Sequence, residues 1–185
     1  RGVVLAETEE PEQVTFTAMR LRAGTPVIAL LESALGIENA TAVAKAPGTF
    51  RLAFGVNDFR KDVGVGEDPL AMAYARSRMV IASRVGGLPG AIDGPPGNTD
   101  GEDAVIESSA VTASMGMTGR LVLNRDQVDW VNRAMSPSED ELAWARDLLE
   151  KHAQGAAVGD GSYLPRVLRA QKIAGLADSY GLWNA

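Results

Sequence analysis

The sequence has no cysteine among its 185 residues and only one histidine, His152. The first absence excludes disulfide bonds, thiolate catalysis and cysteine-ligated zinc or iron–sulfur sites. It fits a reduced compartment, and we expect a cytoplasmic protein. His152 comes near the end of an expected helix, where a cation is favoured, and we interpret it as a solvated residue with no catalytic part.

Long apolar runs and an excess of positive charge are also missing. No apolar run approaches the length that a membrane span requires. The formal net charge of −6 argues against nucleic acid as a partner, because binding a phosphate backbone requires clustered Lys and Arg. It leaves room for a small anionic substrate. The absence of a glycine-rich phosphate loop and of a dinucleotide fingerprint argues against an unrelated phosphate-binding α/β protein.

Short apolar runs alternate with longer helical segments along most of the chain. Strands are expected at residues 3–5, 26–31, 51–54, 91–92 and 121–123, and helices at 10–22, 39–46, 69–85, 102–114 and 126–134. A loop rich in glycine and charge is expected over 55–68. This alternation predicts a parallel sheet with helices outside it. Five such units fit either a small doubly wound sheet or part of an eight-unit barrel, and periodicity alone leaves both open.

The pattern changes near the C-terminus. Ser138, followed three residues later by Glu141, forms a capping box that starts a helix. A last helix is expected over 165–180. We therefore expect a β/α part at residues 1–135 and a C-terminal helical extension at 136–185.

Two carboxylates follow neighbouring expected strands. Glu32 directly follows the strand at 26–31, and Asp58 comes soon after the strand at 51–54. In parallel α/β proteins the loops at this edge of the sheet build the active site. Neighbouring strands lie about 4.8 Å apart, so the two carboxylates can share one cation, and hard oxygen ligands suit Mg²⁺ or Mn²⁺. The alternative is that each carboxylate caps a helix or pairs with an arginine.

Several segments then match known motifs in order along the chain. They are L-L-E-S-A-L-G-I-E-N-A at 30–40, R-L-A-F-G-V-N-D-F-R-K-D-V-G at 51–64, and the segments 73–84, 91–95, 116–128 and 136–146. Together they resemble the HpcH/HpaI aldolase and citrate lyase β-subunit family. In this family the Glu of the first motif and the Asp of the second bind the metal, and they correspond to Glu32 and Asp58.

The resemblance implies a TIM (β/α)8 barrel of the phosphoenolpyruvate/pyruvate type. This chain would supply only about the last five β/α units, units 4 to 8, followed by the helical extension. The family's first units have no counterpart here, so we expect that N-terminal sequence is missing or that a second chain completes the barrel. The resemblance also implies a homo-oligomer, with a trimer favoured and the tail packed on another subunit.

The implied chemistry is that of a Mg²⁺-dependent or Mn²⁺-dependent carbon–carbon lyase or aldolase. The metal would chelate a 2-oxo acid and stabilise the enolate formed as the carbon–carbon bond breaks or forms. Substrates of this kind include CoA thioesters such as citryl-CoA or malyl-CoA, which would make coenzyme A part of the substrate. Asp93 matches a further family position and is assigned as a catalytic residue that lines the substrate pocket; the alternative is that it orders the turn at 95–97.

Three departures from the family pattern support a different function. Glu7 replaces a lysine, Asn124 and Arg125 replace a His-Pro pair, and Pro165 replaces an aspartate that acts in acyl-CoA lyases of the family. The alternative is therefore a non-catalytic citrate lyase β-like subunit or a metabolite-binding homologue. The retained carboxylate pair argues against it, because an unused pair of converging carboxylates is repulsive.

Overall fold

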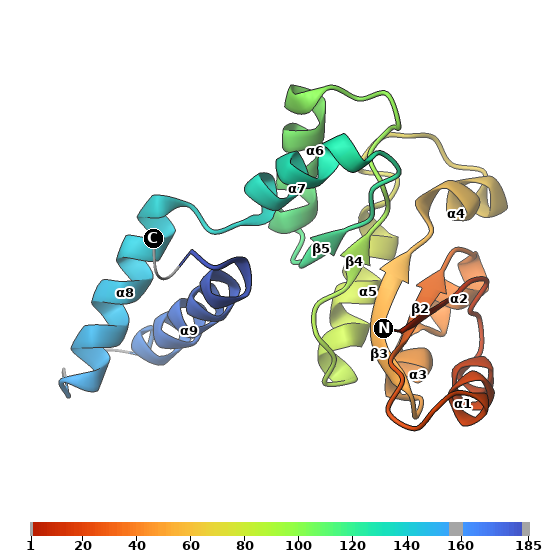
Figure 1. Cartoon of the computed structure of the whole chain (residues 1–185), viewed down its shortest axis with the longest axis horizontal. Helices are drawn as coiled ribbons and strands as arrows, with labels where there is room; N and C mark the ends of the chain where they lie inside the picture. Colours follow the sequence, from red (N-terminus) through yellow and green to blue (C-terminus); the bar gives the residue numbers. More distant parts are fainter. Residues whose placement is uncertain (1, 156–160, 183–185) are drawn as a thin grey trace. The chain divides into compact units, whose positions relative to one another are not determined.

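The computed structural model of the chain describes residues 2–155 and 161–182 (Figure 1). Its contacts divide the chain into two compact units, residues 1–135 and 136–185, and each is described by itself. Across the described ranges, no helix is both long and apolar enough to cross a membrane.

A five-stranded parallel sheet forms the centre of the first unit. Its strands are β1 (Val3–Leu5), β2 (Val27–Leu31), β3 (Thr49–Phe54), β4 (Ile92–Asp93) and β5 (Gly119–Arg120), and they lie side by side in chain order. Every pair is parallel, which confirms the predicted parallel sheet. All five strands therefore end at the same edge of the sheet, where the βα loops gather.

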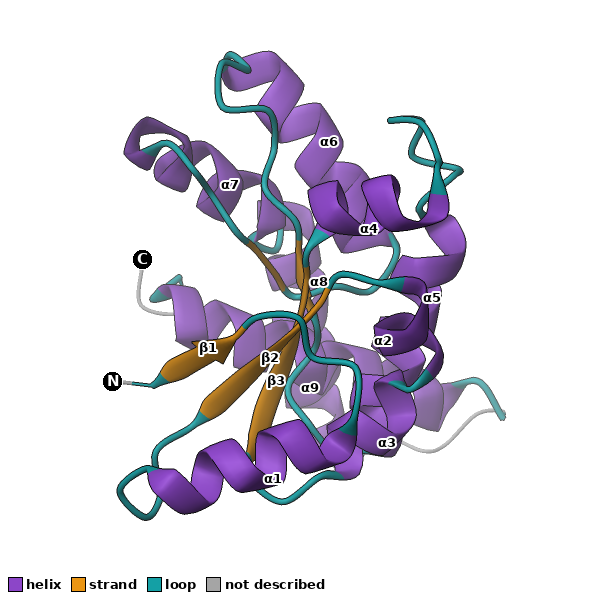
Figure 2. Ribbon diagram, turned by 90° about the vertical axis from the view of Figure 1, so that its right-hand side faces the viewer, coloured by secondary structure: helices purple, strands orange, loops and turns teal. Residues whose placement is uncertain are grey.

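Helices follow each strand. The first unit contains α1 (Pro11–Arg20), α2 (Ala34–Glu38), α3 (Ala40–Lys45), α4 (Val56–Val63), α5 (Ala73–Val85), α6 (Glu102–Ser114), the 3-10 turn η1 (Arg125–Gln127) and α7 (Val128–Met135). Helices α1, α3 and α5 pack against β2 and β3, as Figure 2 shows. The main core lies between them, because alternate residues of β2, Val27, Ala29 and Leu31, are fully buried.

Helix α4 contradicts the predicted loop over 55–68. The segment is rich in charge, but an acidic residue, Asp58, lies in the first turn and Gly64 ends the helix at φ 72°. The single buried residue of α4, Phe59, packs its ring on Phe54 of β3 with the centroids 5.2 Å apart. A short helix depends on such tertiary contacts, which the local sequence does not reveal.

The strand predicted at 121–123 is also wrong, because β5 occupies Gly119–Arg120 instead. Its partner β4 has only two residues, and Pro95 and Pro96 follow soon after without an N–H for further pairing. The last ladder contact is the bond from Leu121 N to Asp93 O, at 2.9 Å. The apolar residues 121–123 therefore lie beyond the end of β5.

The second unit is a pair of helices, α8 (Glu139–Ala153) and α9 (Tyr163–Tyr180). The predicted capping box of Ser138 and Glu141 is present at the start of α8. Helix α9 begins two residues before the predicted position, so Pro165 stands in its first turn, where proline removes no helical hydrogen bond. A small cluster joins the two helices and contains Ala145, Leu148, Val167, Ala170 and Ile173.

Candidate metal and substrate site

Glu32 directly follows β2, and its side chain packs beside the backbone that directly follows β3. Its Oε1 accepts a hydrogen bond from the backbone N–H of Glu7 at 2.6 Å. Gly55 lies directly beside it, and a Cβ on Gly55 would fall 2.4 Å from the Cβ of Glu32 and 2.5 Å from its Oε2. Within the described part of the chain Oε2 has no hydrogen-bond partner. One oxygen of the Glu32 carboxylate is thus fixed by a hydrogen bond, and the other is available to a ligand.

Asp58 lies in the first turn of α4 and lines the same hollow as Glu32. This hollow of about 410 Å³, called here the acidic hollow, is lined by Glu7, Glu9, Gln13, Glu32, Ser33, Asp58 and Asp62. The lining contains five carboxylates and no lysine or arginine. Lys61 approaches from outside and its Nζ lies 2.7 Å from Asp58 Oδ1, an exposed pair that solvent screens strongly.

The oxygens in the acidic hollow fit a Mg²⁺ or Mn²⁺ ion held by two protein carboxylates. Glu9 and Asp62 are already engaged, since Glu9 Oε1 accepts from Ser33 Oγ and Asp62 Oδ2 accepts from the backbone N–H of Ala34. Among the described residues, no group of three or more His, Cys, Asp or Glu is arranged to hold a metal. Two carboxylates with water and substrate filling the other positions are the usual protein environment of Mg²⁺.

Gln13 of α1 fixes the loop that carries Glu7, and sequence reasoning missed this residue. Its Oε1 accepts from the backbone N–H groups of Glu9 and Glu10 at 2.7 and 2.8 Å, and its Nε2 donates to the carbonyl of Glu7 at 3.1 Å. Glu7 has a φ of 49°, an unfavourable value for a side chain of this kind. The signal in the sequence was a Gln three residues into a helix that opens with proline, which is a capping box.

Asp93 is fully buried at the end of β4. Both of its oxygens lie 3.1 Å from Arg76 Nε, Oδ2 accepts from Thr112 Oγ1 at 2.5 Å, and Oδ1 accepts from the backbone N–H of Gly94 at 2.9 Å. These contacts orient Arg76 and the start of the following loop. The catalytic role expected for Asp93 stays a prediction, and its contacts are those of a positioning residue.

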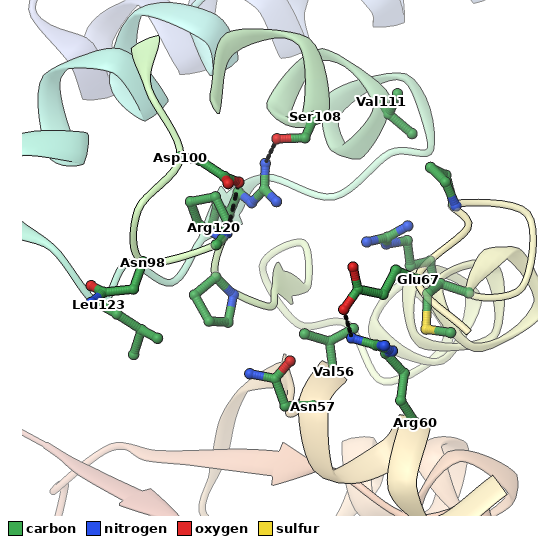
Figure 3. A pocket seen from close by; sticks show the side chains of 16 residues that line it. Val56, Asn57, Arg60, Glu67, Asn98, Asp100, Ser108, Val111, Arg120 and Leu123 are labelled. Carbon is green, nitrogen blue, oxygen red and sulfur yellow. Dashed lines mark hydrogen bonds and ion pairs between the residues drawn. The ribbon is translucent and has the colours of Figure 1, made fainter. Parts of the chain in front are cut away.

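A second hollow of about 490 Å³ lies at the same sheet edge (Figure 3). This arginine hollow is lined by Val56, Asn57, Arg60, Glu67, Pro69, Met72, Arg76, Pro95, Pro96, Gly97, Asn98, Asp100, Ser108, Val111, Arg120 and Leu123. Figure 3 shows two pairs on different sides of the hollow: Arg60 with Glu67, and Arg120 with Ser108. Burial lowers the pKa of Arg120, and the charge of Arg76 lowers it further, while Asp93 and Asp100 act in the opposite direction.

The two hollows meet at the first turn of α4. Asn57 lines the arginine hollow and the next residue, Asp58, lines the acidic hollow. The ends of the strands thus place a hollow lined by carboxylates beside a hollow lined by three guanidinium groups.

Two family models match the chain. Residues 4–125 match the model described as HpcH/HpaI aldolase/citrate lyase, and residues 140–181 match the HpcH/HpaI aldolase C-terminal domain. The two matches cover most of both units.

Curated relatives and solved structures agree with this match. Mitochondrial citramalyl-CoA lyase of Rattus norvegicus is 26% identical over 206 residues, covering 96% of this chain and 61% of the relative. The citrate lyase subunit beta of Leuconostoc mesenteroides subsp. cremoris is 27% identical over 166 residues, covering 84% and 55%. The chain therefore spans about three fifths of the length of such relatives.

Solved structures confirm the predicted α/β fold class. RipC from Yersinia pestis is 26% identical and superposes with a TM-score of 0.70, covering 75% of this chain and 65% of that one. CitE from Mycobacterium tuberculosis, solved with magnesium, acetoacetate and coenzyme A, is 23% identical with a TM-score of 0.75, covering 96% and 68%. At that identity the second likeness speaks for the fold alone.

Proposed function

The chain belongs to the HpcH/HpaI aldolase/citrate lyase family, and from this premise we propose that it acts as a Mg²⁺-dependent carbon–carbon lyase or aldolase on 2-oxo acid adducts. The observation that carries the proposal is the acidic hollow. Glu32 and Asp58 follow adjacent parallel strands and line it together, and no cationic side chain lines it. Such a site attracts and holds a hard divalent cation.

In this proposal Glu32 and Asp58 hold the metal, which acts when bound as a Lewis acid that polarises the 2-oxo group of the substrate. The Glu7 N–H fixes one oxygen of Glu32 and so sets the direction in which the other oxygen points. The close packing of Gly55 limits movement of the same side chain. Preorganisation of this kind reduces the rearrangement needed when charge develops on the substrate.

We further propose that the substrate is a CoA thioester. Relatives of this chain are named citramalyl-CoA lyase and (3S)-malyl-CoA thioesterase, and their names support this substrate class. Pro165, in the first turn of α9, replaces the aspartate that the family resemblance implies for acyl-CoA lyases, and this departure argues against the CoA-thioester class. A direct test is turnover of malyl-CoA or citryl-CoA by the chain, measured as release of the 2-oxo acid.

Titration calorimetry with Mg²⁺ and with Mn²⁺ tests the metal site. We expect Glu32→Gln and Asp58→Asn each to weaken binding by more than about tenfold, because each removes one of two charged ligands. Glu12→Gln is the matched control, since Glu12 is an exposed residue in the first turn of α1 outside the acidic hollow. Equal affinity in all four proteins would refute the metal site.

The alternative function is a non-catalytic citrate lyase β-like subunit or metabolite-binding homologue. Glu7, in place of the family lysine, favours it, because a positive charge that could attract an anionic substrate is replaced by a carboxylate that repels one. The metal titration and the turnover assay together separate the two functions. Metal binding without turnover of any 2-oxo acid adduct would favour the alternative.

We also propose a cytoplasmic homo-oligomer, with a trimer favoured. Support comes from α9, whose Leu164 and Leu168 are 57% and 65% exposed and lie one turn apart on the same face. Light scattering of the full chain and of Leu164→Glu should show a trimer and a smaller species respectively. A monomer in both would contradict the proposal.

A further inference from the structure

We infer that the arginine hollow binds an oxyanion group with two or more negative charges, held by Arg76, Arg120 and Arg60. This inference identifies the anionic part of the substrate and so rests on the proposed function for the molecule that carries it. The binding chemistry is independent of the metal, because the linings of the two hollows share no residue.

Arg76 is the strongest indication of a ligand. The residue is only 9% exposed, and its Nε is bound side-on to both oxygens of Asp93. Neither Nη nitrogen has a hydrogen-bond partner within residues 2–155 and 161–182. The side chain lines the arginine hollow and its Nη groups are open to it, so an acceptor bound in the hollow would complete the hydrogen bonding of the guanidinium.

Arg120 and Arg60 present further donors to the same hollow. Arg120 uses Nε for the carbonyl of Gly94 and Nη1 for Ser108 and Ser109, which leaves Nη2 without a partner in the described chain. Arg60 also lines the hollow, where its Nη1 pairs with the exposed Glu67, and its Nε is buried away from solvent with no hydrogen-bond partner. Three guanidinium groups from α4, α5 and β5 thus converge with donors to spare, an arrangement suited to multidentate recognition of carboxylate or phosphate.

The charges of the two linings differ in sign. Three arginines face Glu67 and Asp100 in the arginine hollow, a formal sum of +1, whereas the five carboxylates of the acidic hollow sum to −5. Glu67 is 83% exposed on its side chain, so its pair with Arg60 is weak and an incoming anion can displace it. A cation is favoured on one side of the first turn of α4 and an anion on the other.

The hollow of about 490 Å³ has room for one oxyanion group and its neighbouring atoms. The shared chemistry is a cluster of negatively charged oxygens, and it has two sources in the proposed substrate: a carboxylate remote from the metal, or the phosphates of a CoA thioester. Malonate and inorganic diphosphate represent these two sources as probes.

The test is titration of the full chain with malonate and with diphosphate, without metal, at constant ionic strength. The readouts are calorimetry and the arginine Nε–H resonances in ¹⁵N NMR. We expect at least one probe to bind and to shift the Arg76 Nε–H signal. Arg76→Lys should weaken binding more than about tenfold and Arg60→Gln severalfold, because each removes charge-assisted donors. The matched control is Arg78→Lys, since Arg78 lies two residues away on α5 and bonds outside the hollow to Glu38 O and Thr41 Oγ1.

Arg60→Gln serves as the second variant. Arg76 is buried, so its substitution can disturb folding, whereas the side chain of Arg60 is partly exposed. Tighter binding of malonate assigns the hollow to a substrate carboxylate, and tighter binding of diphosphate assigns it to the CoA phosphates. Binding of neither probe above the level of chloride, or unchanged affinity in both variants, overturns the inference. Loss of Mg²⁺ binding in Glu32→Gln is measured separately, so failure of the metal proposal is distinguished from failure here.

Discussion

The absence of a side chain at Gly55 leaves the space that the Glu32 carboxylate occupies in the acidic hollow. Gly55 has room for no side chain, because its backbone passes against the Cβ and Oε2 of Glu32. Its backbone angles are allowed for other residues, with φ at −85°. The requirement for glycine here is therefore one of space.

We predict that Gly55→Ala lowers the affinity for Mg²⁺ by more than about tenfold, because the new Cβ must push the Glu32 carboxylate aside. Calorimetric titration measures the change. The control is Gly66→Ala, since a Cβ at Gly66 meets nothing within 4 Å. Equal losses in both variants would show a general effect of alanine and would contradict the steric explanation.

Gln13 gives a second prediction at this scale. Gln13→Glu removes the amide donor to the Glu7 carbonyl while keeping the acceptor for the two N–H groups. We expect faster hydrogen exchange at the Glu7 amide, and Mg²⁺ affinity reduced about tenfold, because the support of Glu32 is loosened. Glu12→Gln is the neighbouring control. Unchanged exchange at Glu7 would mean that other contacts hold this loop.

The sequence predicted that Glu32 and Asp58 would meet at one edge of the parallel sheet and share a cation. Both line one hollow at that edge, and the shared cation stays a prediction. The sequence did not predict the roles of Gln13, Arg76 and Arg120. The signal for Gln13 was local, a capping box with Glu10. The partners of Arg76 and Arg120 lie in other elements, such as Asp93 for Arg76 at a separation of 17 residues, and the local sequence gives no signal of them. Only the folded chain brings the three arginines together.

The contribution of the N-cap Ser138 to the stability of helix α8 can be measured. Ser138→Ala removes the acceptor of the Glu141 N–H, and we expect the free energy of unfolding to fall by about 1 kcal/mol. Chemical denaturation followed by circular dichroism measures this. Ser77→Ala, on the exposed surface of α5, should change stability by less than about 0.5 kcal/mol. A cap variant as stable as the control would show that α8 is fixed by its packing alone.

The sequence pattern predicted the bounds of some elements, and it missed two short ones. α6 occupies the predicted residues 102–114, and β1 the predicted residues 3–5. α4 and β5 differ because a helix of eight residues and a strand of two depend on neighbours, Phe54 in the first case and the proline-limited β4 in the second. Local propensity decides little over such lengths.

On the scale of the whole chain, the two units differ in the size of their cores. The first has a cluster of 18 buried residues around the sheet, and the α8–α9 pair has a cluster of five. We predict that amides of α8 and α9 exchange with solvent at least about tenfold faster than those of β2 and β3, because small cores give marginal stability. Hydrogen exchange by mass spectrometry of the full chain tests this. Equal protection would indicate that a further surface covers the helix pair.

The meeting of the two hollows at consecutive residues of α4 has a consequence for laboratory evolution. Mutational libraries aimed at a new substrate can vary the arginine hollow at Asn98, Val111 and Leu123 without touching a carboxylate of the acidic hollow. Changes at Asn57 are different, because its neighbour Asp58 shares the same helical turn. Substitutions at these two positions should show epistasis, and a library that holds both constant should retain more active members.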